Sequence, residues 1–543
     1  MKPPSASCSA ASTLRPFFAA LRGACGADPL GTLAAEGRLP CALERLLQQL
    51  ADLAGWTAAH APQLRAVTVS TLAYHDAGAT AGQELGLALA TGAAYLRRLT
   101  DAGLPLDAAA EQLTFRLAVG RDVFLELAKL RAARLTWARL VAAAGGTAPA
   151  QRMRIHACTA SRTKTARDPW VNLLRTTVEG FAAAAAGVEA LTTGPFDEAL
   201  GPSDEGSRRL ARNTQTILRD EAELGRVLDP AGGSWYVEAA TRSLAEAGWK
   251  VLQQIETEGG MARALLSGAV GRWIGEAARR RHEATAKRRQ PLTGVSEFAD
   301  IHERRVERSA PAAASLRAEA AAALAEHRKA HPQAAATAGL AARLSTDAPL
   351  EPGALMAAAI DGAAAGATFG QLAALLQAGA GGRPALPEPL EPRRDAAPFE
   401  RLRDASEAYA AIHGRPPRVF LANLGPIPQH RARAEFATNL LQAGGLEPFG
   451  NDGFATPDEA AAAFATSGAE GAAICSTDEA YAEHAEPLAR ALRERGARFV
   501  VLAGRPGERE PAYRAAGIDH FVSLGGDAEQ ALAALLQQLG VPL

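Results

Sequence analysis

PRVFLANLG, residues Pro417–Gly425, is a near-continuous apolar run that ends in a glycine. A run of this length without polar alternation is typical of a strand buried on both faces of a parallel sheet. A helical pattern follows it over Gln429–Ala443. The stretch therefore predicts a strand–loop–helix unit of an α/β fold, with the loop at the carboxyl end of the strand.

Three more strand-like runs follow this unit, and helical patterns separate them. The runs are GAAICS (Gly471–Ser476), RFVVLA (Arg498–Ala503) and HFVSL (His520–Leu524), with helices that include Thr456–Ser467 and Ala482–Arg495. Parallel strands with helical crossovers predict a doubly wound sheet of the flavodoxin-like type, which binds ligands at the carboxyl ends of its strands. The loops to consider are therefore Gly425–His430, Ser476–Tyr481 and Gly504–Gly507.

From about residue 20 to residue 240 short β-type runs alternate with longer helical patterns, which predicts parallel strands in a barrel or an open sheet. Residues 240–310 are predicted to be helical, and the alanine-rich residues 311–400 to form helices followed by a linker. The predicted strands are Ala66–Ser70, Gln112–Leu117, Met153–Ala157, Ala190–Thr193 and Val227–Leu228; the predicted helices are Gly82–Thr100, Arg121–Ala144, Asn172–Ala186 and Ser207–Glu223; proline and glycine cluster at Pro349–Gly353 and Gly379–Pro392.

Length and composition narrow the class of protein. A chain of 543 residues predicts two or more domains, and 58 basic against 59 acidic residues favour neither nucleic acid nor an anionic membrane as partner. The basic run Ala278–Arg289 lacks aromatic residues, which indicates a solvated helix face or a face opposite an acidic partner. Five scattered cysteines without a CxxC motif predict no disulfide framework, no metal site and a reducing cytosol. Neither a signal-peptide core nor a long apolar span is found, so we expect a soluble cytoplasmic protein.

Two blocks of the chain resemble the methylmalonyl-CoA mutase family. The first contains KLRAARLTWARL (Lys129–Leu140), RIHACTASRTKTARDPWVNLLRTT (Arg154–Thr177), FDEAL (Phe196–Leu200), RLARNTQTIL (Arg209–Leu218) and VLDPAGGSWYVE (Val227–Glu238). The second, LANLGPIPQHRARAEFA (Leu421–Ala437), fills the place of the family's first cobalamin-binding loop.

The resemblance implies an α/β architecture with a TIM-type (β/α) barrel over 14–300 and a helical linker region over 301–414. A flavodoxin-like, cobalamin-binding-type domain over 415–543 would follow. No counterpart of the family's first barrel strands precedes Leu14. We therefore expect an N-terminally incomplete barrel or a shortened gene model.

Departures from the family pattern indicate a degenerate cobalamin site. The family's D-x-H-x-x-G loop, whose histidine ligates cobalt, aligns with Ile427, Gln429 and Ala432. His430 lies one residue away, which at the start of a helix turns a side chain by about 100°. The family's S-x-L and Gly-Gly segments align with Ser476-Thr477-Asp478 and Ala503-Gly504. The degenerate cofactor positions are therefore Gln429, His430, Ser476 and Gly504.

The barrel shows a similar loss. His156 matches the family's active-site histidine, but the positions of its partners carry other residues: Gln112 replaces the barrel arginine, and Ala73 and Thr192 replace two histidines. His75 lies two positions from Ala73. We interpret His156 as a vestigial catalytic residue that keeps a local hydrogen bond, and His430 as an exposed residue of a first helical turn.

Together these features predict the small, structural subunit of an adenosylcobalamin-dependent methylmalonyl-CoA mutase. A larger catalytic subunit would bind the cofactor and complete a heterodimer that interconverts methylmalonyl-CoA and succinyl-CoA. Two alternatives remain open: a mutase active in its own right, using His430 in a shifted register, and an acyl-CoA-binding module.

Overall fold

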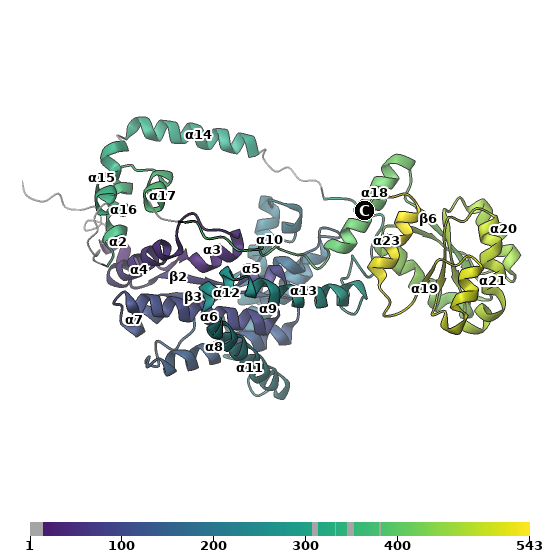
Figure 1. Ribbon diagram of the computed structural model, residues 1–543, viewed down its shortest axis with the longest axis horizontal. Helices are drawn as coiled ribbons and strands as arrows, with labels where there is room; N and C mark the ends of the chain where they lie inside the picture. Colours follow the sequence, from purple (N-terminus) through teal and green to yellow (C-terminus); the bar gives the residue numbers. More distant parts are fainter. Residues whose placement is uncertain (1–14, 307–312, 332, 345–351, 379–381) are drawn as a thin grey trace, which may run out of the picture.

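The computed structural model describes residues 15–306, 313–331, 333–344, 352–378 and 382–543. Its first half is built on a sheet of five parallel strands that follow one another in chain order, as in half of a (β/α) barrel (Figure 1). The strands are β1 (Gly23–Ala27), β2 (Leu64–Ser70), β3 (Leu113–Val119), β4 (Ile155–Thr159) and β5 (Ala190–Thr192). Within the described residues β1 and β5 each pair with a single neighbour, so this sheet is open.

Helices cover the outer side of the first sheet. The predicted helices and four of the predicted strands are confirmed to within a few residues, and one apolar core joins those before residue 200 to the helix Trp235–Thr257. The helices of this part are α2 (Arg15–Ala20), α3 (Pro29–Glu36), α4 (Leu43–His60), α5 (Leu72–Ala77), α6 (Ala81–Asp101), α7 (Leu106–Glu111), α8 (Val123–Ala143), α9 (Val171–Ala185), α10 (Glu205–Thr216), α11 (Trp235–Thr257), α12 (Met261–Leu266) and α13 (Ala269–Ala286). α10 continues as a π-helical turn over Ile217–Glu221.

The predicted strand at Val227–Leu228 is wrong. These residues follow a short 3-10 turn, Leu224–Arg226, and pair with no strand among the described residues. Both side chains are exposed, Leu228 almost completely. Two apolar residues next to a DPAGG turn satisfy a strand pattern, but no neighbouring backbone is present here to complete a ladder.

Three charged side chains are buried beneath the carboxyl ends of β2 and β3. Lys129 of α8 lies 2.8 Å from a Glu84 carboxylate oxygen and 2.6 Å from one of Glu126, and it donates to the Ala118 carbonyl. Glu84 also accepts from the Thr71 hydroxyl and the Ala118 N–H. Burial raises the pKa of Glu126, although the positive charge of Lys129 acts to lower it. Burial also acts to lower the pKa of Lys129, but the negative charges of Glu126 and Glu84 have the larger combined effect and raise it. The KLRAAR motif therefore supplies a structural lysine here.

Replacing this lysine should destabilise the first half of the chain strongly. Lys129→Met leaves two carboxylates buried without their cation, which typically costs about 3–5 kcal/mol. Arg97→Met is the matched control, because the Arg97–Glu256 pair is solvent-exposed and is expected to be worth at most about 1 kcal/mol. Urea unfolding followed by circular dichroism measures both variants. Equal, small shifts of the two midpoints would contradict the assignment.

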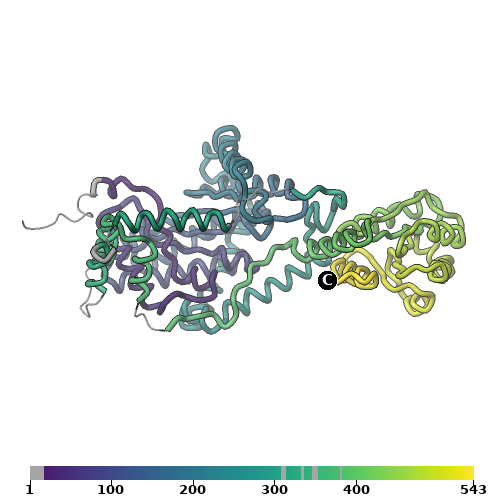
Figure 2. Tube along the Cα trace, turned by 90° about the horizontal axis from the view of Figure 1, so that it is seen from above, coloured from purple at the N-terminus to yellow at the C-terminus, as the bar shows by residue number. Residues whose placement is uncertain are grey.

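The linking region leaves the first sheet, returns to it, and then reaches the second. α14 (Ala313–Ala330) runs apart from the other helices, and α15 (Gln333–Leu344), α16 (Ala354–Ala364) and α17 (Phe369–Gln377) gather beside α4 (Figure 1). Residues 382–396 then run in an extended path to α18 (Ala397–His413) at the second sheet (Figure 2). The proline- and glycine-rich stretches predicted here lie partly outside the described residues.

The second sheet also has five parallel strands, in the order β10-β9-β8-β6-β7. Apolar clusters fill both of its faces, and Leu292 and Phe399 join one of them. Its strands are β6 (Arg418–Asn423), β7 (Glu447–Phe449), β8 (Gly471–Cys475), β9 (Val500–Ala503) and β10 (His520–Val522); its helices are α19 (Ile427–Ala443), α20 (Pro457–Ser467), α21 (Asp478–Glu494), α22 (Glu510–Ala515) and α23 (Ala528–Gln538). The α/β class with parallel strands is therefore confirmed.

In the part of the chain that the structure describes, the helices are too short or too polar to cross a bilayer.

Candidate functional site at the strand ends

The first loop of the second sheet places Gln429 and His430 very differently. Gln429 is exposed, and its side chain folds back so closely over Gly425 that a Cβ there would lie 2.2 Å from its Oε1. Gly425 also has φ +78°, so both the close Gln429 side chain and the backbone conformation require glycine at this position. His430 is only 3% exposed, because it packs against Gly453, and its Nδ1 lies 3.1 Å from the Gly425 carbonyl, to which it donates. The expectation of an exposed His430 is therefore wrong: the glycine at 453 leaves room for the ring.

The ends of β8 and β9 are closed by side chains of the chain itself. Ser476 is fully buried, and its hydroxyl donates to the Leu424 carbonyl at 2.9 Å, which ties the end of β8 to the end of β6. The Tyr481 hydroxyl accepts from the Ser476 N–H at 3.0 Å and lies 2.8 Å from the Ala503 carbonyl. Burial raises the pKa of Tyr481, so its hydroxyl keeps the proton that this bonding pattern needs.

Arg433 of α19 completes this closure. Its guanidinium lies 4.8 Å from the centre of the Tyr481 ring and 2.6 Å from the Asp478 carboxylate. A Cβ added at Gly504 would lie 3.1 Å both from Arg433 Nη1 and from Tyr481 Cε2. Ser476 and Gly504 thus meet around one crevice, which Tyr481 and Arg433 fill.

Sequence reasoning did not single out Tyr481 or Arg433. A tyrosine five residues after Ser476 and an arginine in the next turn after His430 carry no recognisable motif. Only the strand order brings α19 and α21 together over the strand ends.

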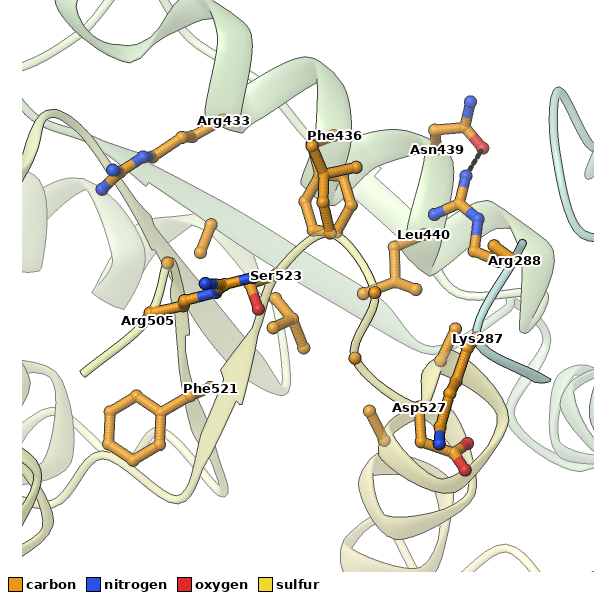
Figure 3. A pocket seen from close by; sticks show the side chains of 18 of the residues that line it. Lys287, Arg288, Arg433, Phe436, Asn439, Leu440, Arg505, Phe521, Ser523 and Asp527 are labelled. Atoms are coloured by element: carbon orange, nitrogen blue, oxygen red, sulfur yellow. Dashed lines mark hydrogen bonds between the residues drawn. The ribbon is translucent and has the colours of Figure 1, made fainter. Parts of the chain in front are cut away.

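A cavity of about 900 Å³ lies beside this crevice, between α19, the residues that follow α13 and the loop before α23 (Figure 3). Basic groups line it, among them Lys287, Arg288 and Arg505, together with the rings of Phe436 and Phe521. Arg288 pairs with Glu297 at 2.5 Å and donates to the Asn439 side chain at 2.7 Å. Acidic residues, including Asp478 and Asp527, lie on the same walls, so neither sign of charge is in strong excess.

His156 lies on β4 of the first sheet, on the same face as Arg116 and Cys158. Its Nε2 is 2.8 Å from the Thr192 hydroxyl, and Arg116 Nε lies 3.2 Å from Cys158 Sγ. Burial and then the Arg116 guanidinium lower the pKa of His156, which favours the neutral imidazole. A neutral ring bonded to one threonine can donate or accept one further hydrogen bond.

The other aligned barrel positions do not assemble around His156. Gln112 is buried at the end of α7, where its side chain accepts from the Ala66 N–H. His75 is buried in α5, and burial lowers its pKa well below the usual range. Thr192 is therefore the one aligned position that contacts His156. Among the described residues no three histidine, cysteine or acidic side chains cluster as a metal site would require.

Removing the Tyr481 hydroxyl should loosen the second sheet. Tyr481→Phe leaves the buried Ser476 N–H and the Ala503 carbonyl without this partner, and an unsatisfied buried group costs about 1–3 kcal/mol. Tyr236→Phe is the matched control, because Tyr236 is exposed and should shift stability by less than about 0.5 kcal/mol. Thermal unfolding measures both, and equal melting temperatures would contradict this role of Tyr481.

The fold and these strand ends define a class of protein: a two-sheet α/β chain whose first sheet is the curled, open half of a TIM-type barrel. The family model described as "Methylmalonyl-CoA mutase" matches residues 8–382. The "Methylmalonyl-CoA mutase small subunit" of Streptomyces virginiae is 43% identical over 523 residues, which cover 96% of this chain and 71% of the relative. The protein of the same name from Propionibacterium freudenreichii subsp. shermanii is 33% identical over 519 residues, which cover 95% and 69%.

The "Methylmalonyl-CoA mutase" of Escherichia coli is also similar, 32% identical over 426 residues that cover 76% of this chain and 59% of the relative. The chain therefore belongs to the methylmalonyl-CoA mutase family, a family of isomerases that generally depend on adenosylcobalamin.

Proposed function

We propose that this chain is the small, structural subunit of a heterodimeric, adenosylcobalamin-dependent methylmalonyl-CoA mutase. A larger subunit would bind the cofactor and the acyl-CoA and would interconvert methylmalonyl-CoA and succinyl-CoA. One observation carries the structural role: Ser476 and Tyr481 bond to one another the strand ends where the family holds its cofactor, and Arg433 lies over the Tyr481 ring. The names of the relatives support the subunit assignment.

The residues present do not fit cobalamin. Gln429 stands at the aligned ligand position, and a neutral amide is a poor ligand beside an imidazole. Ile427 replaces the carboxylate that would orient a metal-bound histidine, and it is half exposed. Tyr481 and Arg433 crowd Gly504 on one side, so a bound group could approach this loop only from the neighbouring cavity, which Gly504 also lines. No chemical step through cobalamin is therefore assigned to this chain.

The same proposal assigns the domains. Residues 415–543 would be a degenerate flavodoxin-like domain, supported by the strand order 2-1-3-4-5 counted along this segment. Residues 14–300 would be the barrel-type domain, with 301–414 as the helical linker region. A cytoplasmic location belongs to the same expectation.

A mutase that is active through His430 is the second candidate. It is favoured by one contact: Nδ1 donates to a backbone carbonyl, as it does in many metal-bound histidines, and this leaves Nε2 as an acceptor. Against it, the ring is 3% exposed and packs against Gly453. A histidine that ligates cobalt has to reach a metal outside the sheet, and a buried His430 ring cannot do so. We therefore prefer the structural role.

Cobalamin content tests the proposal. We expect the chain alone to show no histidine-ligated, base-off spectrum with micromolar cobalamin, because ligand and carboxylate are both replaced. Co-expressed with the larger subunit of the same organism, it should co-purify as a heterodimer that carries one cobalamin. The larger subunit alone is the positive control for the spectrum. A base-off spectrum of the isolated chain that His430→Ala abolishes would establish the second candidate instead.

His156 should be dispensable for turnover. In the reconstituted complex, His156→Ala is expected to change kcat and KM by less than about threefold, since its hydrogen-bond contacts among the described residues are with the Thr192 hydroxyl and the Cys158 thiol of its own sheet. Loss of a general acid would lower kcat by about a hundredfold or more. The steady-state rate of methylmalonyl-CoA formation distinguishes a dispensable His156 from a catalytic one, and Thr192→Ala is the control for the local hydrogen bond.

A further inference from the structure

α9 has its polarity reversed for a surface helix. Its two charged residues, Arg175 and Glu179, are both buried, whereas Leu174, Val178 and Phe181 are exposed along one face. The spacing of four and three residues places these three on a single stripe. A surface helix of a globular protein normally shows the opposite pattern, so the stripe is suited to contact with another surface.

The inward polarity has a clear cause. Glu179 pairs with the buried Lys164 and accepts from the Thr163 hydroxyl at 2.5 Å. Arg175 donates to the Thr293 carbonyl at 2.7 Å. Because these groups must be satisfied inside, the helix cannot rotate to bury its apolar stripe.

Neighbouring residues extend the stripe into a continuous surface, which we call the α9 face: Trp170, Leu174, Val178, Phe181, Leu210 and Ile217. Trp170 and Leu210 line one groove of about 480 Å³. The π-helical turn that carries Ile217 packs against α9, where a Cβ added at Gly180 would lie 3.0 Å from Leu218 Cδ1. The six residues of the α9 face are exposed, and the segment around α10 projects from the body (Figure 2).

Together with two exposed apolar residues beside it, the α9 face reaches the area of one side of a protein interface. Its six side chains are 38–68% exposed. With about 150–250 Å² for each large side chain, they present roughly 500 Å² of apolar surface. Val227 and Leu228, beside the turn that contacts α9, raise this to roughly 800 Å². A typical monomer has a largest apolar patch of about 300–600 Å², and a standard interface covers about 800 Å² on each partner.

We infer that the α9 face is the surface on which this chain docks against the larger mutase subunit. The inference rests on the proposed subunit role and adds the place of contact. The exposed stripe of α9 carries no charged side chain, and depletion of charge is typical of the core of a stable interface. The partner should therefore present a complementary apolar surface of similar area.

The test is a double substitution on the stripe, Leu174→Glu with Val178→Lys. Opposite charges four residues apart support a helix, and both positions are exposed, so the fold should be retained. Ile412→Glu is the matched control, because Ile412 is an exposed apolar residue of α18 outside the α9 face. Circular dichroism and thermal unfolding of each free chain check that the variants fold like the wild type.

Affinity for the larger subunit of the same organism is measured by biolayer interferometry and by co-elution in size-exclusion chromatography. We expect the double variant to bind at least about 100-fold more weakly, and Ile412→Glu to bind like the wild type. Hydrogen exchange of the wild-type complex should show new protection over residues 170–181.

The outcomes separate this inference from the subunit role. If the wild type does not bind the larger subunit, the proposed function fails. If the wild type binds and the double variant binds equally well, without protection of α9, the docking surface lies elsewhere. If the wild type forms a homodimer that the double variant abolishes while binding of the larger subunit persists, the α9 face joins two copies of this chain, and the inference is wrong.

Discussion

The ion pairs of Lys129 with Glu84 and Glu126 fix the geometry on which the first half of the molecule depends. They lie at the carboxyl ends of β2 and β3, where barrel proteins usually place their functional groups. All three residues are buried, so each charge requires the others, and α6 and α8 can sit on the sheet in only one register. Groups that could act on a ligand are in this way held in mutual contact.

The same constraint at the next strand determines the outer surface. Lys164 follows β4 and is fully buried, so α9 must present Glu179 to it. The helix has an apolar side and a polar side, and burial of the polar side forces Leu174 and Val178 outward. An internal electrostatic requirement thus leaves an apolar stripe exposed on the outer side of α9.

Much of the fold is predictable from the sequence, because β2, β3, β4 and the strands of the second sheet other than β7 are rich in apolar or β-branched residues. β1 (GACGA) has no β-branched or large apolar residue, and β7 (EPF) is a three-residue edge strand with a proline, so propensity identifies neither. The candidate site was predictable to the level of loops. Burial of His430 depends on Gly453, and closure of β8 and β9 depends on Tyr481 and Arg433, contacts that exist only once the strands are in order.

The bonding at the strand ends of the second sheet supports the structural role that we propose for this chain. A binding site needs donors and acceptors that remain free until the ligand arrives, and such groups destabilise the unliganded protein. Here the Ser476 hydroxyl and N–H, the Tyr481 hydroxyl and the carbonyls of Leu424 and Ala503 satisfy one another. Each such bond removes a group that a ligand could use and strengthens the sheet. Opening these strand ends to a ligand would require several simultaneous substitutions, because removal of any one partner leaves a buried polar group unsatisfied before a ligand can compensate for it.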